Sequence, residues 1–195
     1  MKLYYSPASP FVRKVVAVAM HHGIELNRVP TNPHESPAEL LADNPLSKVP
    51  CLVTDDGIAL PDSPLICEYL DHMGGGEKLL PDHGAPRWNV LRVVALADGI
   101  MDAAVARRGA SALPQDEGRQ KSDARAKAAI DRALGVLEGE DAEAPLTLGA
   151  VGVVCALGYL DFRFGHEDWR GSHPRLAAWY EKHMQMPIFA ETAPR

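Results

Sequence analysis

Residues 44–69 read N-P-L-S-K-V-P-C-L-V-T-D-D-G-I-A-L-P-D-S-P-L-I-C-E-Y, and they carry the most specific structural signals in the sequence. A short apolar run, Cys51 to Val53, follows a proline and predicts a strand. Asp55-Asp56-Gly57 has the composition of a turn, and Ile58 to Leu60 predicts a second strand. The stretch is therefore expected to form a β-hairpin that the chain enters through a proline.

The hairpin is followed directly by a predicted helix start. Asp62 and Ser63 precede Pro64, and proline is favoured in the first turn of a helix. Ser63 is thus the expected N-cap, with free backbone amides behind it. A helix start of this kind accepts a carboxylate or a phosphate group.

Pro50 is the sharper feature of the stretch. Proline has no amide hydrogen and cannot donate to a neighbouring strand. At a strand entrance it therefore leaves the backbone around the preceding residue, Val49, free to pair with a group outside the sheet. From this context we expect a cis Val49–Pro50 bond, since X-Pro bonds are the ones that adopt the cis form.

Around the hairpin, the first part of the chain alternates strands with helices. Ser9 is the expected N-cap of a helix that begins at Pro10 and stops at Gly23. The order β-α-β-α-β-β-α follows from a strand at 2–5, a helix at 10–22, a strand at 26–29, a short helix at 38–43, the hairpin, and a helix from 63 to the glycines at 74–76. This order is similar to the thioredoxin-like arrangement.

The pattern changes to helices alone in the second part of the chain. Apolar residues at helical spacing predict helices at 88–108, 122–138, 148–162 and 174–186. The third of these is apolar nearly all round and is the expected central helix, with Thr147 as its cap. We predict a first domain at 1–76, a linker at 77–85 and an all-helical domain at 86–195.

Composition excludes several classes of protein. The 195 residues are 46% hydrophobic and 24% charged, which is ordinary for a globular protein. The net charge of −6, without a basic cluster, argues against a nucleic-acid partner. Three scattered cysteines in apolar surroundings, Cys51, Cys67 and Cys155, are typical of buried thiols in a reducing compartment. No metal-ligand spacing and no membrane span are evident, so a cytoplasmic protein without a metal is expected.

The stretch S-P-A-S-P-F-V-R-K, residues 6–14, places two hydroxyls between a strand and a helix. The simplest interpretation is that Ser9 only caps the helix. The same geometry also stabilises an anion such as a thiolate, because a hydroxyl donor is added to the positive end of the helix. Lowering a thiol pKa by ~2 units requires about 2.7 kcal/mol, which one hydrogen bond to a charged group and the helix end can supply together.

These motifs resemble those of the glutathione transferases. In that family the residue before the cis-proline bonds the cysteinyl backbone of glutathione, and an acidic-Ser pair holds the γ-glutamyl group. The resemblance thus implies that Val49, Pro50, Asp62 and Ser63 bind glutathione. S-P-F-V-R-K also resembles the active-site turn of serine-type bacterial and plant members, which implies that Ser9 holds and activates the glutathione sulfur.

Several nearby residues keep more than one interpretation. Ser6 is the competing hydroxyl, although a residue directly after the strand is expected to shape the turn with Pro7. Phe11 either closes over the glutathione site or packs beneath it. Lys48 either pairs with the glycine carboxylate of glutathione or stays solvated, and His34 is a second candidate for that pairing.

The resemblance implies a cytoplasmic, homodimeric glutathione transferase that moves the thiol of glutathione onto an electrophilic small molecule. Where glutaredoxins carry C-P-F/Y-C, this chain has Ser9 and Val12, which argues against thiol–disulfide exchange through the protein itself. Two alternatives stay open: a glutathione-dependent isomerase of the maleylacetoacetate type, and a glutathione-binding or interaction protein that catalyses little.

In the helical part, Asp98 and Asp102 are four residues apart and share one helix face. Either they cap a helix or pair with Arg107 or Arg108, or one of them reaches the γ-glutamyl amine across a dimer interface, as in several transferases. The helix around Met101 and Arg108, with Val105 between them, is the expected lining of part of the electrophile pocket. Arg13 and Lys14 match the family pattern, and their alternative role is a helix-surface or interdomain salt bridge.

Overall fold

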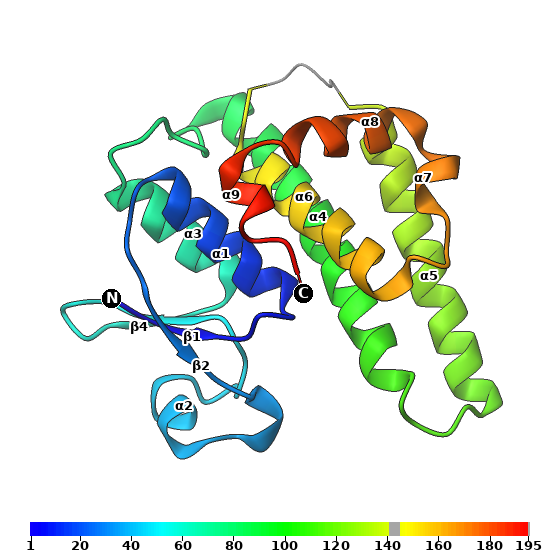
Figure 1. The fold of residues 1–195 in the computed structure, drawn as a ribbon, viewed down its shortest axis with the longest axis horizontal. Helices are drawn as coiled ribbons and strands as arrows, with labels where there is room; N and C mark the ends of the chain where they lie inside the picture. The colour runs from blue at the N-terminus through cyan, green and yellow to red at the C-terminus, as the bar shows by residue number, and fades with distance from the viewer. Residues whose placement is uncertain (141–144, 195) are drawn as a thin grey trace.

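The computed structural model describes residues 1–140 and 145–194, which fold into two parts (Figure 1). One hydrophobic core contains buried residues of both parts. A four-stranded sheet with helices forms the first part. Helices alone form the described residues of the second part. The expected fold class, a thioredoxin-like domain followed by an all-helical domain, is confirmed.

The first part has the predicted order of strands and helices, with one short 3-10 helix added. Its elements are β1 (Lys2–Tyr5), α1 (Pro10–His21), β2 (Asn27–Pro30), η1 (Pro33–Glu35), α2 (Ala38–Asp43), β3 (Cys51–Val53), β4 (Ala59–Pro61) and α3 (Ser63–Met73). The strands lie in the order β2-β1-β3-β4. Figure 1 shows α1 and α3 on one side of the sheet and α2 on the other.

Pairing with neighbouring strands moves two predicted strands by one residue. β2 runs parallel to β1, with Lys2 opposite Asn27, so it begins at Asn27 rather than at residue 26. In the hairpin, the amide of Ile58 donates to the Thr54 hydroxyl at 2.9 Å, which keeps Ile58 in the turn. Gly57 adopts φ 85° there, a left-handed conformation that favours glycine, and β4 therefore starts at Ala59.

Within residues 84–140 and 145–194, the second part contains four helices where they were predicted and two short ones that were not. They are α4 (Gly84–Ala110), α5 (Glu117–Glu138), α6 (Leu148–Phe164), α7 (Trp169–Ser172), α8 (Pro174–His183) and α9 (Pro187–Ala190). α5 begins before the expected residue 122 because the Asp116 carboxylate accepts from the amide of Arg119 at 2.8 Å and caps the helix.

α6 is the central helix, as expected. Thr147 caps it by accepting from the amide of Ala150 at 3.2 Å. Most of its residues are buried, and its glycines let neighbours approach closely. A Cβ at Gly152 would lie 3.1 Å from Ala97 of α4, and one at Gly158 would overlap the guanidinium of Arg13 in α1. α6 thus packs between the first helix and the rest of the helical part.

Two buried cations of α1 cross between the parts. Lys14 is fully buried and its ammonium lies 2.5 Å from the Asp98 carboxylate of α4. The guanidinium of Arg13 donates to the carbonyl of Phe189 at 3.1 Å and to that of Val154 at 3.4 Å. Lys14 thus forms a salt bridge between the two parts, which was one of the alternative roles considered for this pair of residues.

In the described part of the chain, every helix is too short or too polar to cross a bilayer.

Candidate functional site

The strand register brings the predicted site residues to one end of the sheet. Tyr4 lies opposite Cys51 in the antiparallel pair β1–β3, and Cys51 lies opposite Pro61 in β3–β4. The segment after β1, the segment before β3 and the segment after β4 therefore leave the sheet at the same end. These three segments carry Ser9, Val49–Pro50 and Asp62–Ser63.

Ser9 is the N-cap of α1, as predicted. Its backbone is extended, and its hydroxyl oxygen accepts from the amide of Val12 at 3.3 Å. Accepting this bond leaves the hydroxyl hydrogen available, because a serine hydroxyl both donates and accepts. Capping and donation to a bound anion are therefore compatible at this residue.

The start of α3 differs from the prediction in one respect. The N-cap is Asp62, whose carboxylate accepts from the amide of Ser63 at 2.8 Å, and Ser63 is the first helical residue. Asp62 adopts φ 73°, a left-handed conformation that costs energy for a residue with a side chain. This conformation turns the chain sharply from β4 into the helix. The N-cap therefore lies one residue earlier than the position of Pro64 indicated.

The hydroxyl of Ser63 is buried and has no hydrogen-bond partner among the described residues. An unpaired buried hydroxyl costs roughly 1–3 kcal/mol. It lies at the positive start of an eleven-residue helix, where an anion would supply the missing acceptor. Among the predicted residues, Ser63 is therefore the one whose environment most clearly indicates a role in ligand binding.

Asn44, which the sequence analysis did not single out, holds the segment before β3. Its side chain is buried, donates to the carbonyl of Lys48 at 2.9 Å and accepts from the amide of Leu46 at 3.1 Å. The Val49–Pro50 bond that follows is cis. The signal that could have identified Asn44 is its place before Pro45, since Asn favours such turns.

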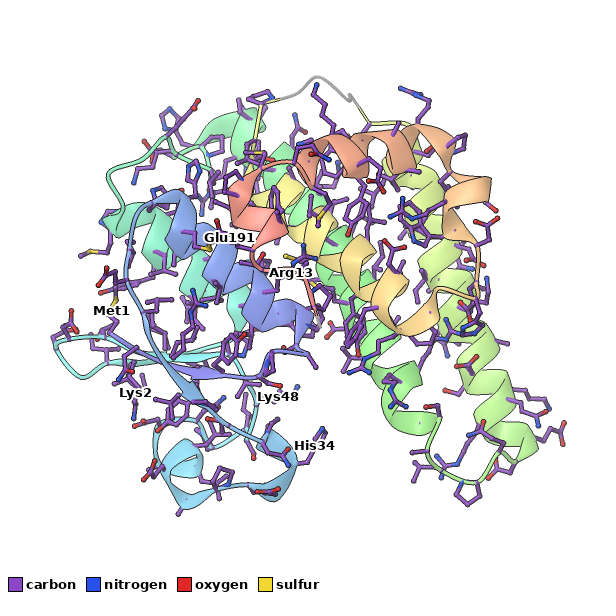
Figure 2. All side chains as sticks on the ribbon, in the orientation of Figure 1. Met1, Lys2, Arg13, His34, Lys48 and Glu191 are labelled. Atoms are coloured by element: carbon purple, nitrogen blue, oxygen red, sulfur yellow. The ribbon has the colours of Figure 1, made fainter. Side chains whose placement is uncertain are left out.

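Lys48 and His34 both lie at the edge of the first domain that faces the helical part (Figure 2). Lys48 is exposed, and His34 is held in η1 by a bond from its amide to Asn32.

Phe11 is half-buried and packs against the hydrophobic core. Ser6 accepts from the amide of Ser9 at 3.1 Å through its backbone carbonyl, as expected for a residue that shapes the turn.

Asp98 of α4 faces the first domain, and its pairing with Arg107 or Arg108, one of the alternatives considered, is wrong. Asp98 pairs with Lys14, whereas Arg107 is held by two carboxylates of the helical part, Asp123 and Glu167. Burial raises the pKa of Asp98, and the charge of Lys14 opposes this rise.

Asp102 responds to charges from both parts of the protein. Burial has the largest effect and raises the pKa of Asp102. The negative charge of Asp98 adds to this rise, and the positive charge of Lys48 opposes it. Asp62 also contributes to the rise. An acidic group of α4 therefore lies within electrostatic range of the segments that carry the predicted glutathione residues.

The three residues expected to line an electrophile pocket have different environments. Met101 is fully buried in the core, so it cannot contact a ligand without rearrangement. Val105 is 38% exposed, and Arg108 is exposed on the same helix. Only the last two remain available as lining.

The cysteines are free and buried. Burial raises the pKa of Cys51 to about 11 and that of Cys67 to about 12, which keeps both as unreactive thiols. The described residues contain no group of three or more His, Cys, Asp or Glu side chains that could hold a metal ion.

Comparison with known proteins gives a consistent result over the whole chain. Residues 3–78 match the family model "Glutathione S-transferase, N-terminal domain", and residues 102–182 match "Glutathione S-transferase, C-terminal domain". The GST-like protein YibF of Escherichia coli K12 is 35% identical, over 100% of this chain and 98% of its own.

Solved structures extend this similarity. A glutathione transferase family member from Pseudomonas fluorescens Pf-5 with bound glutathione is 41% identical, with a TM-score of 0.92 over 100% of this chain and 98% of its own. A second structure from the same organism, with bound S-(propanoic acid)-glutathione, is 39% identical, with a TM-score of 0.87 over 100% of both chains.

Proposed function

Since this chain belongs to the glutathione S-transferase family, we propose that it binds glutathione, ionises its thiol and transfers that thiol to an electrophilic small molecule. The observation that carries the proposal is the unpaired, buried hydroxyl of Ser63 at the start of α3. The γ-glutamyl carboxylate of glutathione would accept a hydrogen bond from this hydroxyl at the positive start of the helix.

Other residues of the site are complementary to the remaining parts of glutathione, which are its cysteinyl backbone, its γ-glutamyl ammonium and its glycine carboxylate. We propose that the backbone of Val49, beside Pro50, bonds the cysteinyl backbone, and that the Asp62 carboxylate attracts the γ-glutamyl ammonium. Lys48 then pairs with the glycine carboxylate. Phe11, which packs on the core, supports the turn that carries Ser9.

Ser9 has the activating role in this proposal. Its free hydroxyl hydrogen donates to the sulfur and so favours the thiolate over the thiol. The start of α1 adds positive potential to that hydrogen bond. The thiolate then attacks an electrophilic carbon, a C–S bond forms, and the leaving group departs with its electron pair.

Conjugation is favoured over the two alternatives by one observation on a neighbour. The second Pseudomonas fluorescens structure binds glutathione with a carbon substituent on its sulfur, which is the kind of product that thiol transfer forms. An isomerase would release unmodified glutathione, and a non-catalytic protein would bind glutathione without lowering its thiol pKa.

We further propose that the protein is a cytoplasmic homodimer with domains at 1–76 and 86–195 joined by a linker at 77–85. Three large apolar side chains on α3 and α4 support a dimer, because they are largely exposed in the single chain: Leu65, Met73 and Trp88. The reduced, buried cysteines support the location.

The decisive experiment is an ultraviolet titration of the thiolate of bound glutathione against pH, on the wild type and on Ser9→Ala, with binding measured by calorimetry. We expect the wild type to lower the thiol pKa by ~2 units and the variant to bind glutathione without that shift.

Binding without a pKa shift in either protein would favour the non-catalytic alternative. A shift retained in Ser9→Ala and lost in Ser6→Ala would move the activating role to Ser6. If neither protein binds glutathione, the proposal is wrong.

A further inference from the structure

Arg13 differs from the other buried cations of the protein in its partners. Among the described residues, three lysine or arginine side chains are buried: Arg13, Lys14 and Arg107. Lys14 pairs with one carboxylate and Arg107 with two. Arg13 forms no salt bridge within residues 1–140 and 145–194. A buried charge without a counterion is costly, so an anion bound near Arg13 would stabilise the protein.

Neutral groups accept the hydrogen bonds of Arg13. Its Nε donates to the Thr192 hydroxyl at 3.4 Å, and its Nη1 donates to the carbonyl of Val154 at 3.4 Å. Its Nη2 donates to the carbonyl of Phe189 at 3.1 Å and to the sulfur of Met184 at 3.4 Å. These bonds fix the guanidinium in place and leave its positive charge uncompensated.

A cavity of about 240 Å³ lies beside this guanidinium. Its walls come from the end of β1, from α1, from β2 and from the C-terminal segment that follows α9. Figure 1 shows that segment, in red, passing across α1, and Figure 2 shows Arg13 and Glu191 where the two meet. The cavity is large enough for an aromatic ring, because a cavity of about 150 Å³ already holds benzene.

Arg28 of β2 brings a second positive charge to the same cavity. Its guanidinium carbon lies 5.9 Å from the centre of the Tyr5 ring, and it makes no hydrogen bond or salt bridge to the described residues. Its donors are therefore available to a ligand, and a guanidinium fork matches a carboxylate with two parallel hydrogen bonds. Other arginines are also exposed, but Arg28 shares a cavity with the buried, uncompensated Arg13.

Glu191 is the carboxylate among the described residues that line the cavity. Its side chain is exposed and forms no salt bridge with either arginine. The described lining thus holds two positive charges and one negative charge, and a single further carboxylate makes it neutral. Val12 and Val16 add apolar surface on the α1 side, which suits the organic part of a ligand.

We propose that this cavity binds a small organic molecule with one carboxylate. The carboxylate pairs with the guanidinium of Arg28 in the electrostatic field of Arg13, and the apolar part of the ligand packs on Val12 and Val16.

The carboxylate site goes beyond the proposed function and is separate from the proposed glutathione site. The described lining of the cavity does not include Ser9, Val49, Asp62 or Ser63. Glutathione and the carboxylate should therefore bind at the same time.

Benzoate and benzamide test the carboxylate site, because they have nearly the same size and differ in charge. By calorimetry, we expect the wild type to bind benzoate about tenfold more tightly than benzamide. Arg28→Gln should remove that preference. Arg132→Gln, an equal loss of charge at an exposed position of α5, is the matched control and should retain it.

Glu191→Gln distinguishes a ligand site from an internal ion pair. At a ligand site, the substitution removes a repelling charge, so benzoate should bind about threefold more tightly and the unfolding temperature should not fall. If Glu191 is instead the counterion of the two arginines, the variant unfolds at a lower temperature and gains no affinity for benzoate, and the inference is wrong.

Three other results would also overturn the inference. These are equal binding of benzoate and benzamide by the wild type, a preference for benzoate that persists in Arg28→Gln, and displacement of benzoate by S-benzylglutathione. The last result would place benzoate in the electrophile pocket. Binding of unmodified glutathione is measured separately, so its absence would contradict the proposed function and leave the carboxylate site standing.

Discussion

Ser63 combines two properties that rarely coexist in a side chain kept only for stability. It is fully buried, and its hydroxyl has no partner in the described residues. For the free protein this hydroxyl is a cost, and for a complex with an anion it is a donor already in place. The two effects have opposite signs, so a single substitution separates them.

Ser63→Ala is therefore expected to weaken glutathione binding by about tenfold or more without lowering the free energy of unfolding of the unliganded protein. Removal of the unpaired hydroxyl leaves the unfolding free energy unchanged or raises it by about 1 kcal/mol. Calorimetry and urea unfolding measure the two quantities.

Ser122→Ala, on the exposed face of α5, is the matched control and should retain glutathione affinity. A large loss of stability in Ser63→Ala would instead mean that the hydroxyl supports the fold.

At the scale of elements, the contact between α6 and α1 depends on Gly158. A methyl group there would overlap the guanidinium of Arg13 and lie 3.0 Å from the Tyr180 hydroxyl. Arg13 would have to move and lose its bonds to Phe189 and Val154. We expect Gly158→Ala to lower the free energy of unfolding by about 1–3 kcal/mol.

Gly135→Ala provides the comparison, because a Cβ at Gly135 of α5 meets nothing within 4 Å. Alanine is the better helix former, so this change should raise the unfolding free energy by up to about 1 kcal/mol. Equal effects of the two substitutions in thermal or urea unfolding would contradict the role assigned to the α6–α1 contact.

Local patterns predicted most of these elements, and tertiary partners account for the differences. The spacing of apolar residues and the positions of proline and serine were sufficient to predict the order of strands and helices. They also predicted the caps at Ser9 and Thr147. The cap at Asp62 was missed because it depends on a left-handed backbone conformation, which spacing does not reveal. The partner of Asp98 was missed because Lys14 is 84 residues away in the sequence.

The candidate site was predicted to a similar extent. Val49–Pro50 and Asp62–Ser63 come to one end of the sheet because β3 and β4 form the predicted hairpin. Ser9 joins them through the antiparallel pairing of β1 with β3, which is a long-range contact. Asn44 was not predicted as part of the site. A buried amide looks like an ordinary loop residue until its neighbours are known.

At the scale of the whole molecule, the exposed apolar residues of α3 and α4 predict association of two copies. Trp88 is 67% exposed and Met73 is 59% exposed. Sedimentation should give twice the mass of one chain, and Trp88→Ser should raise the dimer dissociation constant by about tenfold or more, since buried tryptophans dominate interfaces. Val136→Ser, at an exposed apolar position of α5, should leave the mass unchanged. A wild-type monomer at micromolar concentration would contradict this prediction.

The bond from Arg13 to the carbonyl of Phe189 joins residues 176 positions apart. A ribosome adds roughly 5–20 residues per second, so Arg13 waits roughly 10–35 s after its own synthesis before this partner exists. During that interval the guanidinium of Arg13 in the newborn protein can bond only to water or to partners other than Phe189. The turn that presents Ser9 is thus among the first segments to be made and among the last to be completed.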